Sequence, residues 1–204
     1  MSDIIENKKM KLEIMGTIKE GIEIGIKNIG PILVNVLLWV LTCWIPYLNV
    51  GTTIGLAIGI VSKASKGESI PYTEIFDSKY RKYMGEYFLT CGLVTLGVLV
   101  GFVFFIIPGY VIAIAWLFAP MLAIDKGKNP AEAITISNNI TYGNKWRIFG
   151  ILFLVGLVVG VAAAILGKIP AIGYFLTFIV TLFAIFVFIG IQASLYKQLA
   201  GDIQ

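Results

Sequence analysis

Residues 105–149 read FIIPGYVIAIAWLFAPMLAIDKGKNPAEAITISNNITYGNKWRIF, and the rest of the chain is interpreted outward from this stretch. A Pro108-Gly109 turn opens a long apolar run, which a charged corner at residues 125–128 closes. Residues 129–132, Asn-Pro-Ala-Glu, have the capping pattern of a helix start. Residues 143–147 then lead back into apolar sequence. This order is typical of a membrane hairpin whose polar corners lie on one face of a bilayer.

The composition favours a helical membrane protein. Hydrophobic residues make up 58% of the chain and charged residues only 14%, whereas a soluble domain is about a quarter charged. Several apolar runs approach the roughly 20 residues that a spanning helix needs, and they lack the alternation of a transmembrane barrel. We therefore expect an all-α polytopic membrane protein with about six transmembrane helices, arranged as three hairpins with cytoplasmic interfacial helices.

The expected membrane domain is a single unit covering residues 31–204. Its hairpins are predicted at about 31–62, 87–124 and 148–195. Their tips fall at three equally spaced pairs, Ile45-Pro46, Ile107-Pro108 and Ile169-Pro170. Equal spacing indicates an internal repeat, although helices of membrane length also produce it by chance. The first hairpin is short for a hydrocarbon core of about 30 Å, so it either spans the bilayer or is re-entrant.

Residues 1–30 are predicted to form an amphipathic N-terminal segment, which lies in the headgroup region or packs under the membrane domain. Its apolar positions recur three and four residues apart: Leu12, Met15, Ile18, Ile22, Ile26 and Ile29. Two interfacial helices are expected further on, one opened by Pro71 and one over residues 129–142. The first should turn Ile75, Phe76 and Tyr80 toward lipid. Within the fourth apolar segment, Pro120 should kink the helix.

Charge distribution predicts the orientation. Every Lys and Arg except Lys168 lies on the side of the termini, and an excess of positive charge marks cytoplasmic loops. We therefore expect a multi-pass protein of the bacterial inner (plasma) membrane with both termini in the cytoplasm. Tyr110 is assigned to the outer aromatic belt and Trp146 to the inner one. Lys145, Trp146 and Arg147 should contact inner lipid headgroups, with Asn144 capping the helix that follows, and Lys168 should reach outer phosphates.

The residue types exclude several kinds of chemistry. The chain has no histidine, which removes Ser-His-Asp and Cys-His mechanisms. No charged residue lies inside an apolar segment away from its ends, which argues against an ion-coupled pump. The cytoplasmic acids, including Glu74 and Asp125, are interpreted as solvated loop charge. We expect no enzyme activity, no cofactor, no metal site and no nucleic-acid partner.

Small and polar residues in the apolar segments predict helix packing. Glycines at four-residue spacing leave nearly bare helix faces, which favours close packing within the chain or between copies of it. They are Gly51, Gly55, Gly59, Gly97, Gly101, Gly156 and Gly160. Asn35 and Gln192 are the polar groups that are most unfavourable to leave unpaired. Each forms either a hydrogen bond between helices or a contact to a ligand.

A set of turns and caps carries a family resemblance. In order along the chain these are residues 107–110 (IPGY), 118–120 (FAP), 130–133 (PAEA), Ser137 and residues 143–149 (GNKWRIF). They resemble a group of small bacterial six-helix membrane proteins of unknown function. That group is similar to the membrane domain fused to some glycerophosphoryl diester phosphodiesterases, and the similarity covers about residues 65–200.

The resemblance implies a six-helix fold in a bacterial inner membrane. It does not imply phosphodiesterase activity, which belongs to a separate soluble domain with histidines and carboxylates. This chain also lacks a charged residue in the fourth segment, where many relatives are expected to carry an arginine. We expect a non-catalytic accessory or lipid-interacting protein whose partners are membrane lipids and a membrane protein or a second copy. The alternative is a channel or carrier for a small or lipidic molecule.

Overall fold

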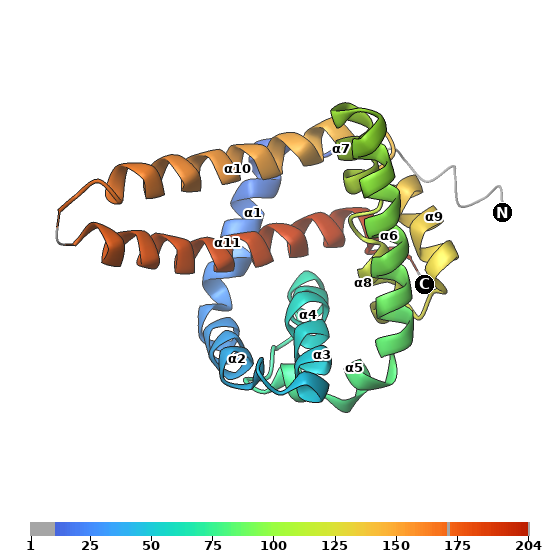
Figure 1. Ribbon diagram of the computed structural model, residues 1–204, viewed down its shortest axis with the longest axis horizontal. Coiled ribbons are helices and arrows are strands. Elements are labelled where there is room, and N and C mark those ends of the chain that lie inside the picture. Colours follow the sequence, from blue (N-terminus) through green and yellow to red (C-terminus); the bar gives the residue numbers. More distant parts are fainter. Residues whose placement is uncertain (1–10, 171, 204) are drawn as a thin grey trace.

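In this computed structural model, which describes residues 11–170 and 172–203, every regular element is a helix (Figure 1). The all-α prediction is confirmed, and residues 1–10 of the predicted N-terminal segment lie outside the described part. In chain order the elements are α1 (Ile14–Lys27), α2 (Ile29–Thr42), α3 (Pro46–Ile54), the π-helix η1 (Gly55–Gly59), α4 (Ile60–Lys66), the 3-10 helix η2 (Glu74–Phe76), α5 (Ser78–Lys82), α6 (Met84–Phe104), α7 (Ile106–Ala115), α8 (Ala119–Asp125), α9 (Pro130–Thr141), α10 (Lys145–Leu166) and α11 (Gly173–Ala200).

Among the described helices, four segments are long and apolar enough to cross a membrane: α6, α7 with α8, α10 and α11. A fifth is added if α1 and α2, which meet at a bend of 71°, form one span. The membrane class is therefore supported, whereas the full set of six spans is not confirmed. The helix α2 has 14 residues, which at 1.5 Å per residue is less than the core thickness. The segments α3, η1 and α4 follow one another without a break from Pro46 to Lys66, but they are not among the four spans.

The predicted hairpin tips lie at or near helix boundaries. Pro46 is the first residue of α3, and its fixed φ suits the first turn of a helix. The break between α6 and α7 is the extended residue Phe105, close to the second Ile-Pro pair. The third pair, Ile169-Pro170, lies between the end of α10 and the start of α11. Pro108 and Gly109 lie inside α7, so the turn predicted there is wrong by a few residues, whereas the other two turns lie between helices.

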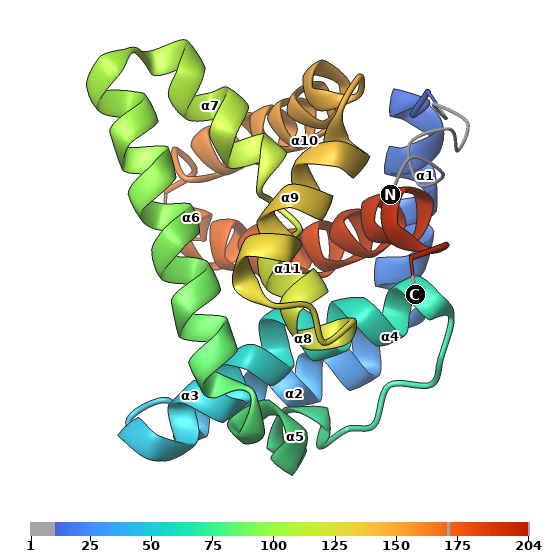
Figure 2. The ribbon, with the colours of Figure 1, turned by 90° about the vertical axis from the view of Figure 1, so that its right-hand side faces the viewer.

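The predicted arrangement as three hairpins with interfacial helices is not confirmed. Figure 1 shows α6 and α7 running up the molecule, whereas α10 and α11 form a long arm across it, and Figure 2 agrees. The cause lies in the connection between these hairpins. The fourth segment breaks between α7 and α8, just before Pro120, where the sequence predicts a kink. From there α9 packs back along α8, α6 and α7.

Two side chains of α9 form hydrogen bonds to backbone groups at the break between α7 and α8. The Ser137 hydroxyl donates to the Ala115 carbonyl at 2.8 Å and accepts the N–H of Phe118 at 3.2 Å. The Thr141 hydroxyl also lies 3.3 Å from the Ala115 carbonyl. The predicted cap at the start of α9 is present, since the Asn129 side chain accepts the N–H of Glu132 at 2.9 Å. These 12 residues, about 18 Å of helix, return the chain to the level of α7 before α10 begins.

The N-terminal helix α1 packs against the C-terminal half of α11 through glycines. A β-carbon on Gly190 would lie 1.9 Å from the Gly21 carbonyl oxygen, and one on Gly25 would lie 2.4 Å from the Phe186 carbonyl oxygen. Thus the packed alternative for this segment describes the structure, and the predicted apolar face is buried only in part, at Leu12 and Ile18. Met15 and Ile26 of that face are exposed. Sequence reasoning missed Gly21, Gly25 and Gly190, although Gly21 and Gly25 have the four-residue spacing that favours close helix contact.

Candidate functional site

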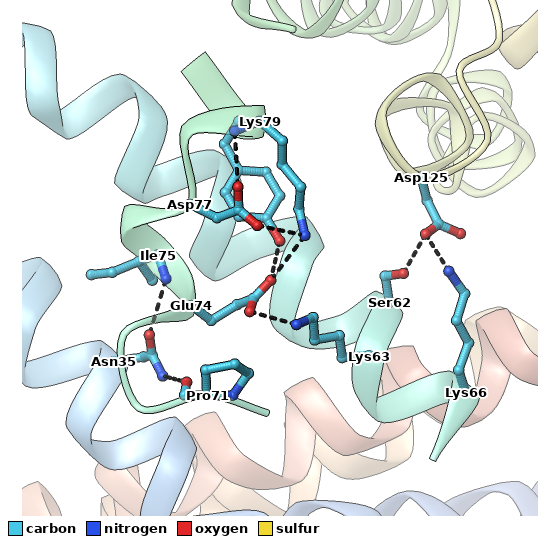
Figure 3. Close-up of polar contacts among 11 residues, drawn as sticks. Asn35, Ser62, Lys63, Lys66, Pro71, Glu74, Ile75, Asp77, Lys79 and Asp125 are labelled. Atoms are coloured by element: carbon cyan, nitrogen blue, oxygen red, sulfur yellow. Dashed lines mark hydrogen bonds and ion pairs between the residues drawn. The ribbon is translucent and has the colours of Figure 1, made fainter. Parts of the chain in front are cut away.

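The connection from α4 to α5 is held against α2 by one buried amide. Asn35 is fully buried, and its Nδ2 donates to the carbonyls of Pro31 and Pro71, both at 2.9 Å. Its Oδ1 accepts the N–H of Ile75 at 3.1 Å (Figure 3). Of the two interpretations of Asn35, the structure thus shows a hydrogen bond within the protein. This bond places η2, and with it Glu74, beside α4.

Glu74 is 3% exposed and forms the centre of a buried charge cluster (Figure 3). Its carboxylate is 2.8 Å from Lys63 Nζ and 3.3 Å from Lys79 Nζ, and it accepts the hydroxyl hydrogen of Tyr80. A buried carboxylate is tolerated only when charge partners and hydrogen bonds replace water, and these three groups do so. The expectation that Glu74 is solvated loop charge is wrong.

Tyr80 reaches Glu74 through the glycine face of the helix formed by α3, η1 and α4. A β-carbon on Gly59 would lie 1.9 Å from Tyr80 Oη, and one on Gly55 would lie 3.0 Å from its ring. The ring is 1% exposed, and Ile75 beside it is also buried. Both were expected to face lipid, and that prediction is wrong because the glycines leave a slot that these side chains fill. Burial and the Glu74 hydrogen bond raise the pKa of Tyr80 far above its ordinary value, so its hydroxyl remains a donor.

Lys79 stays charged in this environment. Burial alone lowers the pKa of its ammonium, but the hydrogen bond to Asp77 and the charge of Glu74 outweigh burial and raise that pKa. Asp77 also accepts the backbone N–H of Lys79 at 2.9 Å and so caps α5. This backbone bond is the largest cause of the lowered pKa of Asp77.

A second carboxylate, Asp125 at the end of α8, pairs with the other lysine of α4. Its side chain lies 2.6 Å from Lys66 Nζ, accepts the Ser62 hydroxyl, and accepts the Tyr196 hydroxyl of α11 at 3.1 Å. The Asp125 side chain is only 7% exposed, so its assignment to solvated loop charge is also wrong. Lys63 and Lys66 therefore fasten α4 to two different neighbours.

Between these two clusters opens the lysine pocket, a cavity of about 190 Å³. Its wall combines apolar surface with polar side chains that α4, α5 and α8 contribute. They include Ser62, Lys63, Lys66, Lys79, Tyr80 and Asp125. The convergence of these residues was not predicted from the sequence, because it depends on how α8 and η2 pack on α4.

A second cavity, the aromatic pocket, has a volume of about 360 Å³ and is mostly apolar. It lies between α7 and the start of α10. Its lining includes Tyr110, Ile114, Tyr142, Lys145, Trp146 and Phe149. The assignment of Tyr110 and Trp146 to opposite aromatic belts is wrong, since both line this pocket. Their rings lie 5.9 and 6.1 Å from that of Phe149. The return of the chain along α9 brings them together.

The predicted headgroup residues do not form one group. Lys145 and Trp146 share the aromatic pocket, where Trp146 is 73% exposed and Lys145 Nζ donates to Asn138 Oδ1 at 2.9 Å. Arg147 is outside that lining, and its Nη1 is enclosed with no hydrogen-bond partner within the described chain. Lys168 is exposed at the tip of the α10–α11 arm. Asn144 does not cap α10 through its side chain, which accepts the N–H of Leu12 at 3.1 Å.

The predicted packing glycines fall into two environments. Five have a close neighbour within the chain: Gly51 meets the Arg81 side chain, Gly55 and Gly59 meet Tyr80, Gly97 meets Trp116 and Gly101 meets Gly109. Gly156 and Gly160 on α10 have no neighbour within 4 Å of an added β-carbon in the described structure. A contact between copies of the chain therefore stays a prediction for these two.

Comparison of the chain with protein-family models, curated proteins and solved structures found no match. The resemblance to membrane domains associated with glycerophosphoryl diester phosphodiesterases therefore stays a prediction. Within the described residues, no three His, Cys, Asp or Glu side chains lie close enough to hold a metal ion. The two pockets differ instead in what they can bind: one offers ammonium groups and hydroxyls, the other an apolar surface beside one lysine.

Proposed function

We propose that this protein is a non-catalytic membrane protein that holds a phospholipid in the aromatic pocket and acts as an accessory to a membrane partner. The observation that carries the proposal is the pocket itself. It is apolar over most of its wall, opens beside the exposed ring of Trp146 and has Lys145 at its lining. An acyl chain suits the apolar wall, and a headgroup phosphate suits the ammonium.

The size and chemistry of the pocket support this occupant. Its volume of about 360 Å³ lies within the roughly 300–1,000 Å³ of pockets that bind small organic molecules. Only one of the three donors of the Lys145 ammonium is used by Asn138, so donors remain for a phosphate oxygen. Trp and Tyr side chains are favoured where apolar and polar surroundings meet, and Tyr110, Tyr142 and Trp146 all lie here.

In the same proposal the protein lies in a bacterial plasma membrane with both termini in the cytoplasm. The support is the distribution of charge in the sequence, with Lys and Arg gathered in residues 63–82 and 126–147 and Lys168 as the one basic residue between 148 and 196. Basic corners of this kind attract anionic headgroups. A membrane-impermeant thiol reagent that labels a Ser2→Cys variant in intact cells would contradict this orientation.

The test compares two exposed tryptophans. Trp146→Ala removes a wall of the aromatic pocket, whereas Trp44→Ala removes a ring that is 75% exposed at the α2–α3 tip, outside the pocket. We expect the amount of phospholipid that co-purifies with the protein in mild detergent, measured by mass spectrometry, to fall in Trp146→Ala and to stay unchanged in Trp44→Ala. Val111→Trp, which fills the pocket, should also lower it. Equal lipid content in all three variants and the unmodified protein would refute the proposal.

One observation favours the alternative, a carrier. Helices broken within the membrane line the binding sites of many transporters, and the α7–α8 segment is broken between Ala115 and Ala119. The backbone groups at this break are bound by Ser137 and Thr141 of α9, which favours the accessory function. We expect no potassium or chloride flux above that of empty liposomes when the purified protein is reconstituted. Flux that is lost on substitution of Gly51 or Gly55 would support the channel or carrier instead.

A further inference from the structure

We propose that the lysine pocket is a second binding site, separate from the aromatic pocket, and that it binds a phosphate group through the ammonium groups of Lys63, Lys66 and Lys79. The three side chains line one cavity although they come from two separate helices. This site goes beyond the proposed lipid binding, because it involves none of the residues of the aromatic pocket.

The ammonium groups have donors left for a ligand. A lysine carries three N–H donors. In the described contacts Lys63 uses one on Glu74 and Lys66 uses one on Asp125. Lys79 binds Glu74 at 3.3 Å and Asp77 at 3.1 Å. Each ammonium therefore has at least one N–H with which to bind a phosphate oxygen.

The buried carboxylates fix these ammonium groups in place. Glu74 holds Lys63 and Lys79 from one side of the pocket, and Asp125 holds Lys66 from the other (Figure 3). Both carboxylates also accept tyrosine hydroxyls, from Tyr80 and Tyr196 respectively, so their own positions are set by packing. Lysines held in advance lose less side-chain freedom on binding than lysines free on a surface.

The dimensions select a small polar group. At about 190 Å³ the cavity is smaller than the roughly 300 Å³ at which pockets for larger organic ligands begin. Phosphate offers several oxygens to donors that arrive from different directions, and a lysine ammonium binds it as a point charge. The phosphate belongs either to a lipid headgroup or to a small soluble ester, and the chemistry of recognition is the same for both.

One residue of the pocket lining allows a test of the charge of the ligand. Glu68 is exposed and contributes a carboxylate to the lining of the pocket. If the ligand is an anion, this carboxylate weakens binding, because like charges repel across a short distance. Glu68→Gln should therefore increase the affinity for phosphate. A decrease would mean that the ligand is not an anion and would overturn the proposal.

The main experiment measures binding of inorganic phosphate and glycerol phosphate to the delipidated protein in detergent by titration calorimetry. Lys79→Gln and Lys66→Gln each remove one charge-assisted contact and should weaken binding about tenfold or more. Lys82→Gln is the matched control, because Lys82 lies on the same helix as Lys79 but outside the pocket lining, and it should bind like the unmodified protein. No saturable binding, or equal affinity in all variants, would overturn the proposal.

A measurement on the unmodified protein guards against variants that fail to fold. Lysine acetylation is followed by mass spectrometry with and without ligand. Phosphate should slow acetylation of Lys66 and Lys79 several-fold and leave that of Lys82 unchanged, and equal rates at all three would contradict the site. The same assay identifies the source of the phosphate. Protection in nanodiscs of anionic phospholipid alone supports a lipid headgroup, whereas protection only by added soluble ester supports a soluble ligand.

Discussion

Two helices of this protein carry the same row of glycines and use it in opposite ways. In the helix made of α3 and η1, Gly55 and Gly59 lie against Tyr80 so closely that a β-carbon on Gly59 would be 1.9 Å from the hydroxyl. On α10, Gly156 and Gly160 face no atom within 4 Å in the described structure. The spacing of glycines thus indicates how close a neighbour is able to approach, and it does not identify that neighbour.

The glycines Gly55 and Gly59 pack against a polar cluster, whereas Gly156 and Gly160 lie on a long apolar arm. Tyr80 lies on its glycine slot because Glu74 accepts its hydroxyl and Lys63 and Lys79 balance the charge. Around Gly156 and Gly160, Leu157, Val158 and Val161 are exposed, as suits contact with lipid tails. Variants in the two regions should therefore differ in their effect on stability, and four predictions test that difference.

The largest effect is expected from Gly55→Leu. A β-carbon there would lie 2.7 Å from the Ile75 Cα, and backbone cannot move aside as a flexible side chain does. Overpacking typically costs about 1–3 kcal/mol and occasionally more, so the melting temperature in detergent should fall clearly. The control is Gly92→Leu on α6, a position with open space. Equal melting temperatures for the two variants would contradict the packing described here.

Tyr80→Phe should have an intermediate effect. It keeps the ring in the glycine slot but removes the hydroxyl that donates to the buried Glu74 carboxylate. Loss of a hydrogen bond to a charged group costs about 1.5–3 kcal/mol, measured as the free energy of unfolding in a denaturant titration. Tyr83→Phe is a suitable control, since Tyr83 is only partly buried. A Tyr80→Phe variant as stable as the control would show that the hydroxyl contributes nothing.

A smaller effect concerns pH. The Asp77 carboxylate caps α5, and its pKa is lowered in the folded protein. A group with a lowered folded pKa adds stability above its unfolded pKa of about 4, and that stability is lost as the pH falls through the folded value. Stability should therefore decrease on acidification below about pH 4. Asp77→Asn should reduce this dependence, which thermal melts at a series of pH values would detect; an unchanged slope would contradict it.

The smallest effect is expected at the glycine row of α10. Gly160→Leu should leave the melting temperature of the monomer in detergent unchanged, because nothing in the described structure lies beside that position. Light scattering during size-exclusion chromatography then tests the remaining use of the row, contact with a second copy. If the unmodified protein is a dimer that Gly160→Leu dissociates, the row is an interface. If both are monomers, it faces lipid.

The local structure could be predicted from the sequence, but the arrangement of the helices in space could not. Pro46, Pro120 and Asn129 act within a few residues of their own positions, through a fixed φ or a side-chain cap, and a helix begins at or next to each of them. The direction of the α10–α11 arm depends instead on how α9 packs against α7 and α8. That packing is set by Ser137 and Thr141 bonding to the distant Ala115 carbonyl.

The candidate sites show the same limit. Lys66 on α4 pairs with Asp125, which lies 59 residues later in the chain. No local sequence pattern predicts such a pair. The Glu74 cluster was missed because acids in a lysine-rich loop are ordinarily solvated. One further sign was present, since a row of glycines in α3 and η1 requires something to fill it, and Tyr80 is the large side chain that follows on the next polar segment. The contact of Lys145 and Trp146 with lipid headgroups stays a prediction.

The contact between α1 and α11 has a consequence for biosynthesis. Glu20 of α1 and Ser194 of α11, which are hydrogen-bonded at 2.6 Å, are separated by 174 residues. At a translation rate of about 5–20 residues per second, the first helix waits on the order of ten to thirty seconds for its partner. During that interval Gly21 and Gly25 lack the surface against which they pack in the finished protein. The helix α1 is thus held in place by a helix that is synthesised 174 residues later.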